Sequence, residues 1–164
     1  MNIDVSRIVS AEGAVVPVSG TVAPENLMFN GQDIRFTAPV TVEGKVENIG
    51  GDVYLSLDIT ATFLTNCARC LKEIERTLSF SVHEVFSKRE IAEDEDVLPL
   101  ESDEIALAPL VEDAFCMELP YNYLCDEDCA GLCPVCGCDR NQTDCGCETE
   151  QIDPRLAALK DFLQ

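Results

Sequence analysis

Val53-Tyr-Leu-Ser-Leu-Asp-Ile-Thr-Ala-Thr-Phe63 alternates apolar with polar side chains along its whole length. This period of two is typical of a β-strand that buries one face. The same alternation runs from Ile34 to Val46, and the turn-forming run Asn48-Ile-Gly-Gly51 separates the two segments. The sequence therefore predicts a long β-hairpin at the centre of the fold.

Weaker strand signals flank this hairpin on both sides. Leu78, Phe80 and Val82 continue the alternation and predict a third strand, which makes the core an antiparallel meander. The segments 3–9 and 15–22 are weaker strand candidates, and a proline and a glycine interrupt the second of them. Interrupted strands of this kind lie at sheet edges, so we expect both segments there.

A helix is predicted after the sheet. Positions i, i+3, i+4, i+7, i+8 and i+11 of this segment are Leu107, Leu110, Val111, Ala114, Phe115 and the charged Glu118. This spacing places the apolar side chains on one helical face, which should pack on the sheet. Pro109 is tolerated in the first turn, and Pro120 ends the helix.

Two other segments are predicted from their local pattern. Residues 90–104 are acidic with one short apolar run, which indicates a mobile loop. Asp153-Pro154 has the form of an N-cap followed by proline at the first helical position, and Leu156, Leu159 and Leu163 form a short apolar stripe. A final helix is therefore predicted at 153–163.

The cysteines predict a metal site in the last part of the chain. Cys133-Pro-Val-Cys136-Gly is a knuckle that presents two sulfurs on one side of a tight turn, as tetrahedral zinc requires. Cys145 and Cys147 supply a second pair after an eight-residue loop. Gly137 and Gly146 favour the sharp turns that such a site needs.

A second quartet consists of Cys67, Cys70, Cys125 and Cys129. It would join segments more than fifty residues apart, so the metal would be part of the fold. The sequence leaves the pairing open, because Cys138 could replace any ligand. A single site that combines Cys67 and Cys70 with Cys133 and Cys136 also fits.

These patterns together predict an α+β fold with two domains. Residues 1–120 are expected to form an antiparallel β-meander domain with one packing helix. Residues 121–164 are expected to form a cysteine-rich zinc-binding module with the C-terminal helix. Structural zinc of this kind contributes on the order of 10 kcal/mol to folding, which is comparable with the stability of a whole domain.

Charge and composition restrict the possible partners and compartments. The formal net charge is −20, and 90–128 holds fourteen carboxylates with no Lys or Arg. This acidity indicates a solvated surface or a docking face for a basic partner, and it disfavours a broad nucleic-acid interface. The chain has no targeting signal at its start and no apolar run of about 18 residues, so a cytoplasmic protein without a membrane span is expected. In that reducing compartment, cysteines serve as thiolate ligands.

Catalytic motifs are not found in the sequence. His83, the one histidine, falls on the polar side of the third strand, and neither a metalloprotease nor a deaminase pattern surrounds it. Cys116 lies on the predicted helix and is interpreted as a small buried apolar residue. Because four-thiolate zinc sites are coordinatively closed, the metal is not expected to act as a Lewis acid. The sequence therefore predicts no enzyme and no catalytic residues.

A set of motifs in combination resembles the YceD family. These motifs are Cys67-Ala-Arg-Cys70-Leu after a long hairpin, Leu110-Val-Glu-Asp, Leu119-Pro120, Cys125-x-x-x-Cys129-x-Gly-Leu-Cys133-Pro-x-Cys136-Gly and Asp153-Pro-Arg-Leu-x-x-Leu159. The resemblance runs from about Thr41 to the C-terminus, with Cys138 standing where the family motif has another residue.

The family is associated with accumulation of large-subunit ribosomal RNA. The resemblance therefore implies a non-catalytic accessory factor in ribosome biogenesis or precursor RNA processing. Some members lack the C-terminal cysteines, which implies that this part supports the fold rather than a shared chemistry. The acidic charge favours action through a basic ribosomal protein or a processing enzyme, and direct RNA contact is left open.

Two rival hypotheses use the cysteines differently. A thiol redox or zinc-sensing protein would use Cys138 and Cys116 and would need a cysteine of depressed pKa. Neither Cys-x-x-Cys pair has the strand-to-helix context of a thioredoxin-like motif, which weighs against it. An iron–sulfur protein is the other possibility, because four-cysteine sets also hold such clusters.

Overall fold

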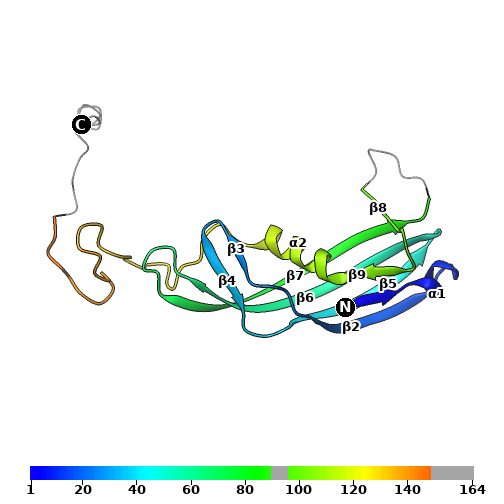
Figure 1. Ribbon diagram of the computed structural model, residues 1–164, viewed down its shortest axis with the longest axis horizontal. Coiled ribbons are helices and arrows are strands. Elements are labelled where there is room, and N and C mark those ends of the chain that lie inside the picture. The colour runs from blue at the N-terminus through cyan, green and yellow to red at the C-terminus, as the bar shows by residue number, and fades with distance from the viewer. Residues whose placement is uncertain (90–95, 149–164) are drawn as a thin grey trace, which may run out of the picture. The chain divides into compact units, whose positions relative to one another are not determined.

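The computed structural model describes residues 1–89 and 96–148 (Figure 1). The chain forms two compact units. The first unit comprises Met1–Thr65 and Glu73–Tyr121. The second comprises Asn66–Lys72 together with the chain from Asn122 onward, so it includes a loop that the predicted division at residue 120 assigned to the β domain. The predicted helix at 153–163 lies outside the described residues.

The predicted central hairpin is present. Strands β5 (Val40–Ile49) and β6 (Asp52–Asn66) pair antiparallel, with Ile49 opposite Asp52. Gly50 and Gly51 form the two-residue turn and have φ angles of 65° and 93°. Positive φ at both positions is the requirement of the hairpin turn that matches strand twist, and glycine meets it without strain. The apolar residues of β6 are buried at every second position.

The predicted strand from Ile34 to Val46 is wrong in one respect, because it is broken. Strand β4 (Gln32–Phe36) ends before a bend at residues 37–39, and β5 begins at Val40. Both segments pair with β6, with Phe36 opposite Phe63 and Thr41 opposite Thr60. The interruption coincides with Pro39, which has a fixed φ and no N–H to donate to the ladder.

The remaining strands of the sheet extend it on both sides of the hairpin. Strand β7 (Glu73–Ser87) pairs with β6, and β8 (Leu98–Pro99) adds a short parallel pairing with β7. Strand β2 (Val15–Val22) pairs with β5, and β3 (Leu27–Phe29) pairs with β4. The third strand and the edge position of β2 are therefore confirmed. The prediction of a mobile loop at 90–104 is corrected for Leu98–Pro99, which pairs with β7, and residues 90–95 lie outside the described residues.

The N-terminal segment is not the single strand predicted for 3–9. It forms β1 (Asn2–Asp4) and then the one-turn helix α1 (Ser6–Val9). The carboxylate of Asp4 accepts a hydrogen bond from the Ser6 N–H, and Val5 and Ile8 are buried at helical spacing. Strand β1 pairs antiparallel with β9 (Glu104–Ala106) in a separate two-stranded sheet.

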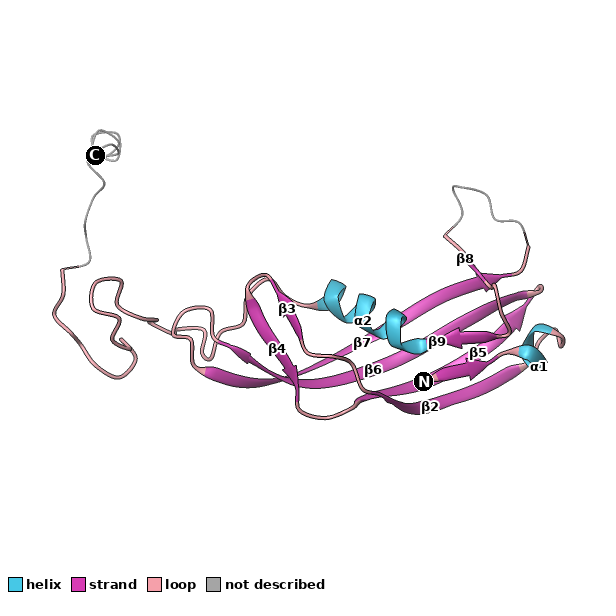
Figure 2. Cartoon of the chain, in the orientation of Figure 1, coloured by secondary structure: helices cyan, strands magenta, loops and turns pink. Residues whose placement is uncertain are grey.

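Helix α2 (Leu107–Glu118) follows β9 and lies across one face of the sheet (Figure 2). Its predicted bounds and packing face are confirmed. The ring of Phe115 lies 5.0 Å from that of Phe36, 5.3 Å from that of Phe63 and 6.3 Å from that of Phe80, measured between centroids. Such aromatic contacts add to the burial energy of the core. The described part of the first unit is thus mostly antiparallel β-sheet, with one helix of several turns.

Among the described residues, no helix is long and apolar enough to cross a membrane.

Candidate metal centres

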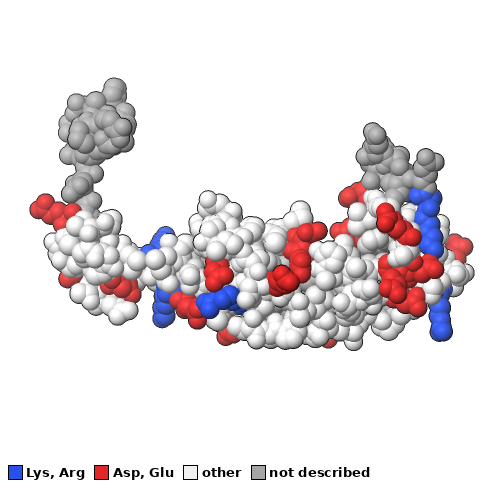
Figure 3. Space-filling view, viewed as in Figure 1, with Lys and Arg blue, Asp and Glu red and all other residues white. Residues whose placement is uncertain are grey.

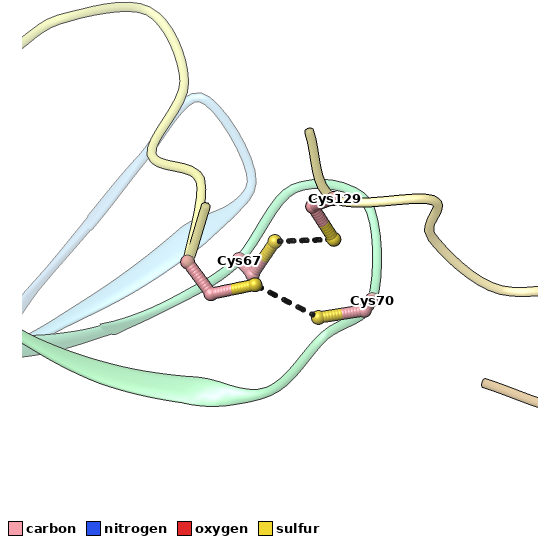
Figure 4. Close-up of side chains that lie close together, drawn as sticks. Cys67, Cys70 and Cys129 are labelled. Atoms are coloured by element: carbon pink, nitrogen blue, oxygen red, sulfur yellow. Dashed lines mark hydrogen bonds between the residues drawn. The ribbon is translucent and has the colours of Figure 1, made fainter. Parts of the chain in front are cut away.

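Four thiols of the second unit form what we call the first cluster, consisting of Cys67, Cys70, Cys125 and Cys129. Their sulfurs all lie within 4.8 Å of one another. The Sγ atoms of Cys67 and Cys129 are 3.8 Å apart, and those of Cys70 and Cys125 are 3.6 Å apart (Figure 4). The structure thus brings together the long-range quartet that the sequence suggests.

The connection between β6 and β7 positions the first two thiols. The Cys67 N–H donates to the Lys72 carbonyl at 2.8 Å, and the Leu71 N–H donates to the Cys67 carbonyl at 2.9 Å. Leu71 has a φ of 60°, a left-handed conformation that turns the chain back after Cys70. The Ala68 N–H donates to the Tyr123 carbonyl at 2.8 Å, which brings the segment carrying Cys125 alongside.

Arg69, between the two thiols of this loop, holds the other half of the first cluster. Its guanidinium Nη1 donates to the carbonyls of Glu127 at 3.1 Å and Cys129 at 2.9 Å. Its own carbonyl accepts from the Leu132 N–H at 3.0 Å. Arg69 is not among the residues that the cysteine motifs predict as functional. The available signal was an arginine inside a Cys-x-x-Cys turn in a strongly acidic chain.

The environment of the first cluster favours thiolate at one position and opposes it at another. Burial acts to raise the pKa of Cys67, but hydrogen bonds from the N–H groups of Cys70, Cys125 and Arg69 lower it to about 6. The pKa of Cys125 is raised to about 12, chiefly by the neighbouring thiols of Cys129 and Cys70 and by burial. The quartet therefore cannot carry four negative charges unless a cation compensates them.

The first cluster fits a single tetrahedral ion. Zinc–sulfur bonds of about 2.3 Å place tetrahedral thiolates about 3.8 Å apart, close to the two measured separations. A disulfide would require sulfurs about 2.05 Å apart, and all ten cysteines are free. Leu124 and Leu132 pack against the buried thiols and exclude water from them.

Four thiols after the first cluster form the second cluster, consisting of Cys133, Cys136, Cys145 and Cys147. Their sulfurs also lie within 4.8 Å of one another. The Gly137 N–H donates to the Cys133 carbonyl at 2.8 Å and closes the predicted knuckle. Gly137 has a φ of 75°, which a side chain would strain. Cys133 is buried, whereas Cys136 is exposed.

The second cluster also favours ionisation of one thiol over its neighbours. The pKa of Cys145 is lowered to about 6, chiefly by a hydrogen bond from the Cys147 N–H. The thiols of Cys138 and Cys133 lower it further. The pKa of Cys147 is raised to about 12 by the thiols of Cys145 and Cys136 and by burial. A cation at this position would offset the repulsion between neighbouring thiolates, as in the first cluster.

Asn141 connects the two clusters. It lies in the loop between Cys136 and Cys145, and its Nδ2 donates to the Sγ of Cys129 at 3.4 Å. Its Oδ1 accepts from the Ala130 N–H at 2.7 Å, and the Asp139 carboxylate holds its amide at 2.6 Å. The Asp-Arg-Asn run at 139–141 has the composition of a turn, but its contact with Cys129 has no sequence signal.

Other predicted residues lie away from a shared site. The two quartets assemble separately, so the alternative single site of Cys67 and Cys70 with Cys133 and Cys136 is not the arrangement found. His83 is exposed, as predicted, with Nδ1 3.3 Å from the Ser56 hydroxyl. Cys116 is half-buried rather than buried, because the preceding Phe115 takes the position that faces the sheet.

The fold and the two clusters define a class of protein: an antiparallel β protein whose second unit gathers two sets of four thiols. Residues 55–163 match the family described as large ribosomal RNA subunit accumulation protein YceD, and the chain belongs to this family. The predicted resemblance is thus confirmed.

Relatives of the chain occur in several bacteria. The uncharacterized protein Rv2926c of Mycobacterium tuberculosis is 30% identical over 169 residues, covering 99% of this chain and 81% of the relative. ML1660 of Mycobacterium leprae is 29% identical, covering 98% and 76%. YlbN of Bacillus subtilis is 31% identical, covering 88% and 86%. No solved structure matches the chain significantly.

Proposed function

We propose that this chain is a zinc-stabilised, non-catalytic accessory factor that supports the accumulation of large-subunit ribosomal RNA. Membership of the YceD family carries the ribosomal part of the proposal. The two four-thiol clusters support the zinc part, with the eight thiols of both quartets as ligands. In this proposal the β-sheet unit provides a binding surface, and bound metal stabilises the fold of the second unit. A cytoplasmic location belongs to the same proposal.

Zinc is preferred over an iron–sulfur cluster on geometric grounds. An iron–sulfur cluster interposes several irons and sulfides between its thiolates, so those thiolates lie farther apart than around one ion. Sulfur separations of 3.6 and 3.8 Å in the first cluster suit a single ion. Thiolates are soft ligands, and zinc takes four of them without a preference imposed by d-electrons.

The absence of catalysis is proposed from the chemistry of the ligands. A catalytic zinc site keeps one position for water, whereas a four-thiolate site is filled by protein ligands. The first cluster is also packed against Leu124 and Leu132, which limits access to its thiols.

The partner is proposed to be a basic ribosomal or RNA-processing protein. Acidic side chains lie over several parts of the face seen in Figure 3, with few basic ones among them. In the first unit, Asp4 lies directly opposite Glu104 in the β1–β9 pair, and Glu101 is exposed nearby in sequence. Like charges placed opposite each other in a sheet are unfavourable. Hydrogen bonds from Ser6 and the charge of Arg7 already hold the pKa of Asp4 below its usual value, so the exposed Glu101 and Glu104 are the carboxylates that a cationic partner would contact.

Cells that lack the protein provide the test. We expect a lower ratio of large-subunit to small-subunit ribosomal RNA, restored by the intact chain and by the matched control Cys116→Ser. A chain carrying Cys67→Ser should fail to restore it, because the first cluster loses its metal. An unchanged ratio in cells without the protein would refute the ribosomal proposal.

A second experiment addresses the partner. Cross-linking in cells, followed by identification of the linked proteins, should recover a basic ribosomal or processing protein, and Glu101→Lys with Glu104→Lys should reduce its yield. Lys substitutions at the exposed Glu12 and Glu118, neither of which lies in a strand pair, provide the charge-matched control. Direct, steeply salt-dependent binding to naked ribosomal RNA with no linked protein would contradict a protein partner.

A further inference from the structure

The second cluster contains a repeated tripeptide that its quartet does not account for. Cys136-Gly-Cys138 is followed by aspartate, and Cys145-Gly-Cys147 is followed by glutamate. The central glycines, Gly137 and Gly146, have φ angles of 75° and 61°. Both glycines therefore have positive φ, which other residues adopt only with strain.

The two tripeptides also place their thiols in equivalent surroundings. A backbone contact places Cys138 beside this cluster, because the Cys133 N–H donates to the Cys138 carbonyl at 2.8 Å. The neighbouring thiols of Cys145 and Cys136 raise the pKa of Cys138 to about 12, and the same two thiols raise the pKa of Cys147 to about 12. Cys136 and Cys145, the first cysteines of the two tripeptides, are therefore neighbours of both Cys138 and Cys147.

We propose that Cys138 and Cys147 are alternative fourth ligands of the second cluster, with Cys133, Cys136 and Cys145 held constant. The second cluster is then an exchange site for a thiophilic divalent ion, here zinc, whereas the first cluster is a fixed structural site. This inference rests on the proposed binding of zinc by the second cluster.

The exchange step balances without any other reactant. As the Cys138 sulfur bonds to zinc, the Cys147 sulfur leaves it, and the proton released by the Cys138 thiol passes to Cys147. The zinc keeps four thiolates before and after, with no change of net charge or oxidation state. Because the incoming ligand is already adjacent, the ion never has to lose a ligand to water before gaining the next.

The burial of the two clusters agrees with this division. Cys67 and Cys129 have 0% and 3% of their surface exposed, behind Leu124 and Leu132. Cys136 is exposed, and Cys138 and Cys147 are half-buried. The exposed thiol of Cys136 therefore makes the second cluster more accessible to an acceptor for the metal than the first, whose most exposed thiol is the half-buried Cys125.

Zinc stoichiometry of three variants tests the inference directly. Native mass spectrometry of the reduced, zinc-loaded full chain should give two zincs for the wild type. Cys147→Ser should keep both zincs, because Cys138 takes over, whereas Cys145→Ser should keep one. The double variant Cys138→Ser with Cys147→Ser should also keep one. Retention of one zinc by Cys147→Ser alone would overturn the inference while leaving the proposed zinc function intact.

Alkylation of the loaded wild type gives a second readout that does not depend on variants. A brief treatment with iodoacetamide, mapped by peptide mass spectrometry, should label both Cys138 and Cys147, since each is free part of the time. Label confined to Cys138, with Cys147 protected, would overturn the exchange. A chain that carries no zinc at all would instead refute the proposed function, so the two failures are distinguishable.

Discussion

The two cysteine clusters use the same four-thiol chemistry in opposite ways. The first joins residues 62 positions apart in the chain, and its thiols are mostly buried. The second draws its thiols from residues 133–147, and Cys136 is exposed. Closing a long loop costs more chain entropy than closing a short one, so a metal in the first cluster determines more of the fold. Similar ligand sets can thus serve a long-range structural closure and a local, accessible metal site.

The surroundings of the sulfurs differ in the same direction. In the first cluster, the Arg69 backbone N–H donates to Cys67 at 3.4 Å, and the Asn141 amide donates to Cys129 at 3.4 Å. Such outer hydrogen bonds orient the ligands of a metal and tune its affinity. The second cluster is instead bordered by the additional thiol of Cys138. The first cluster is therefore built to hold its ligands in one arrangement.

The largest expected effect comes from removing a ligand of the first cluster. Cys129→Ser should lose one zinc and unfold the segments that the first cluster joins, because structural zinc supplies on the order of 10 kcal/mol to folding. The sheet and α2 should retain their own unfolding transition, since their core contains none of these thiols. Hydrogen exchange of the loop Asn66–Lys72, read beside that of β5, checks this outcome.

Cys116→Ser serves as the control for this prediction, because Cys116 belongs to neither cluster. If Cys129→Ser keeps both zincs and full protection of the loop, the structural role of the first cluster is wrong.

Removing a ligand of the second cluster should have a smaller effect. Cys136→Ser should also lose one zinc, but the loop Asn66–Lys72 should stay protected because the first cluster is intact. Because the first cluster closes a longer loop, a metal there should stabilise the folded chain by about 1 kcal/mol more than a metal in the second cluster. Zinc stoichiometry and hydrogen exchange measured on the same sample provide the comparison. Equal loss of protection in Cys136→Ser and Cys129→Ser would show that the clusters are one cooperative structure.

The next effect in size concerns Arg69. Arg69→Ala removes the hydrogen bonds to the carbonyls of Glu127 and Cys129, which should cost about 1.5 kcal/mol. Zinc affinity of the first cluster should therefore fall about tenfold. Competition with a chromophoric chelator measures the change. Arg140→Ala, at an exposed arginine of the same unit, is the matched control, and an equal loss in both variants would point to charge rather than to the hydrogen bonds.

The hairpin and α2 could be predicted because their signals are local. Alternation in 53–63 and the apolar stripe from Leu107 to Phe115 each reflect one buried face, and the structure places β6 and α2 there. The bend at 37–39 was missed because Pro39 interrupts a pattern that continues on both sides. The short helix α1 was missed because the burial of Val5 and Ile8 depends on contacts made by the rest of the fold.

The clusters were predictable in part. Cys-x-x-Cys turns identify thiol pairs by spacing, and the remaining cysteines suggest how the pairs combine. The residues around the sulfurs were not predictable in the same way. Arg69 and Asn141 act across 60 and 12 positions of the chain, and such contacts exist only after the loops have folded. Spacing identifies candidate ligands, whereas their outer hydrogen bonds are a property of the tertiary structure.

The smallest predicted effect asks whether the two clusters are independent. Asn141→Ala removes the N–H···S bond to Cys129 and the acceptor for the Ala130 N–H, at a cost of under about 1 kcal/mol. Because Asn141 lies in the loop that Cys136 and Cys145 close, its contact should form only when the second cluster is loaded. Zinc affinity of the first cluster should then fall by similar factors in Asn141→Ala, in Cys136→Ser and in the double variant. Additive losses in that double variant would mean that Asn141 stabilises the first cluster without help from the second.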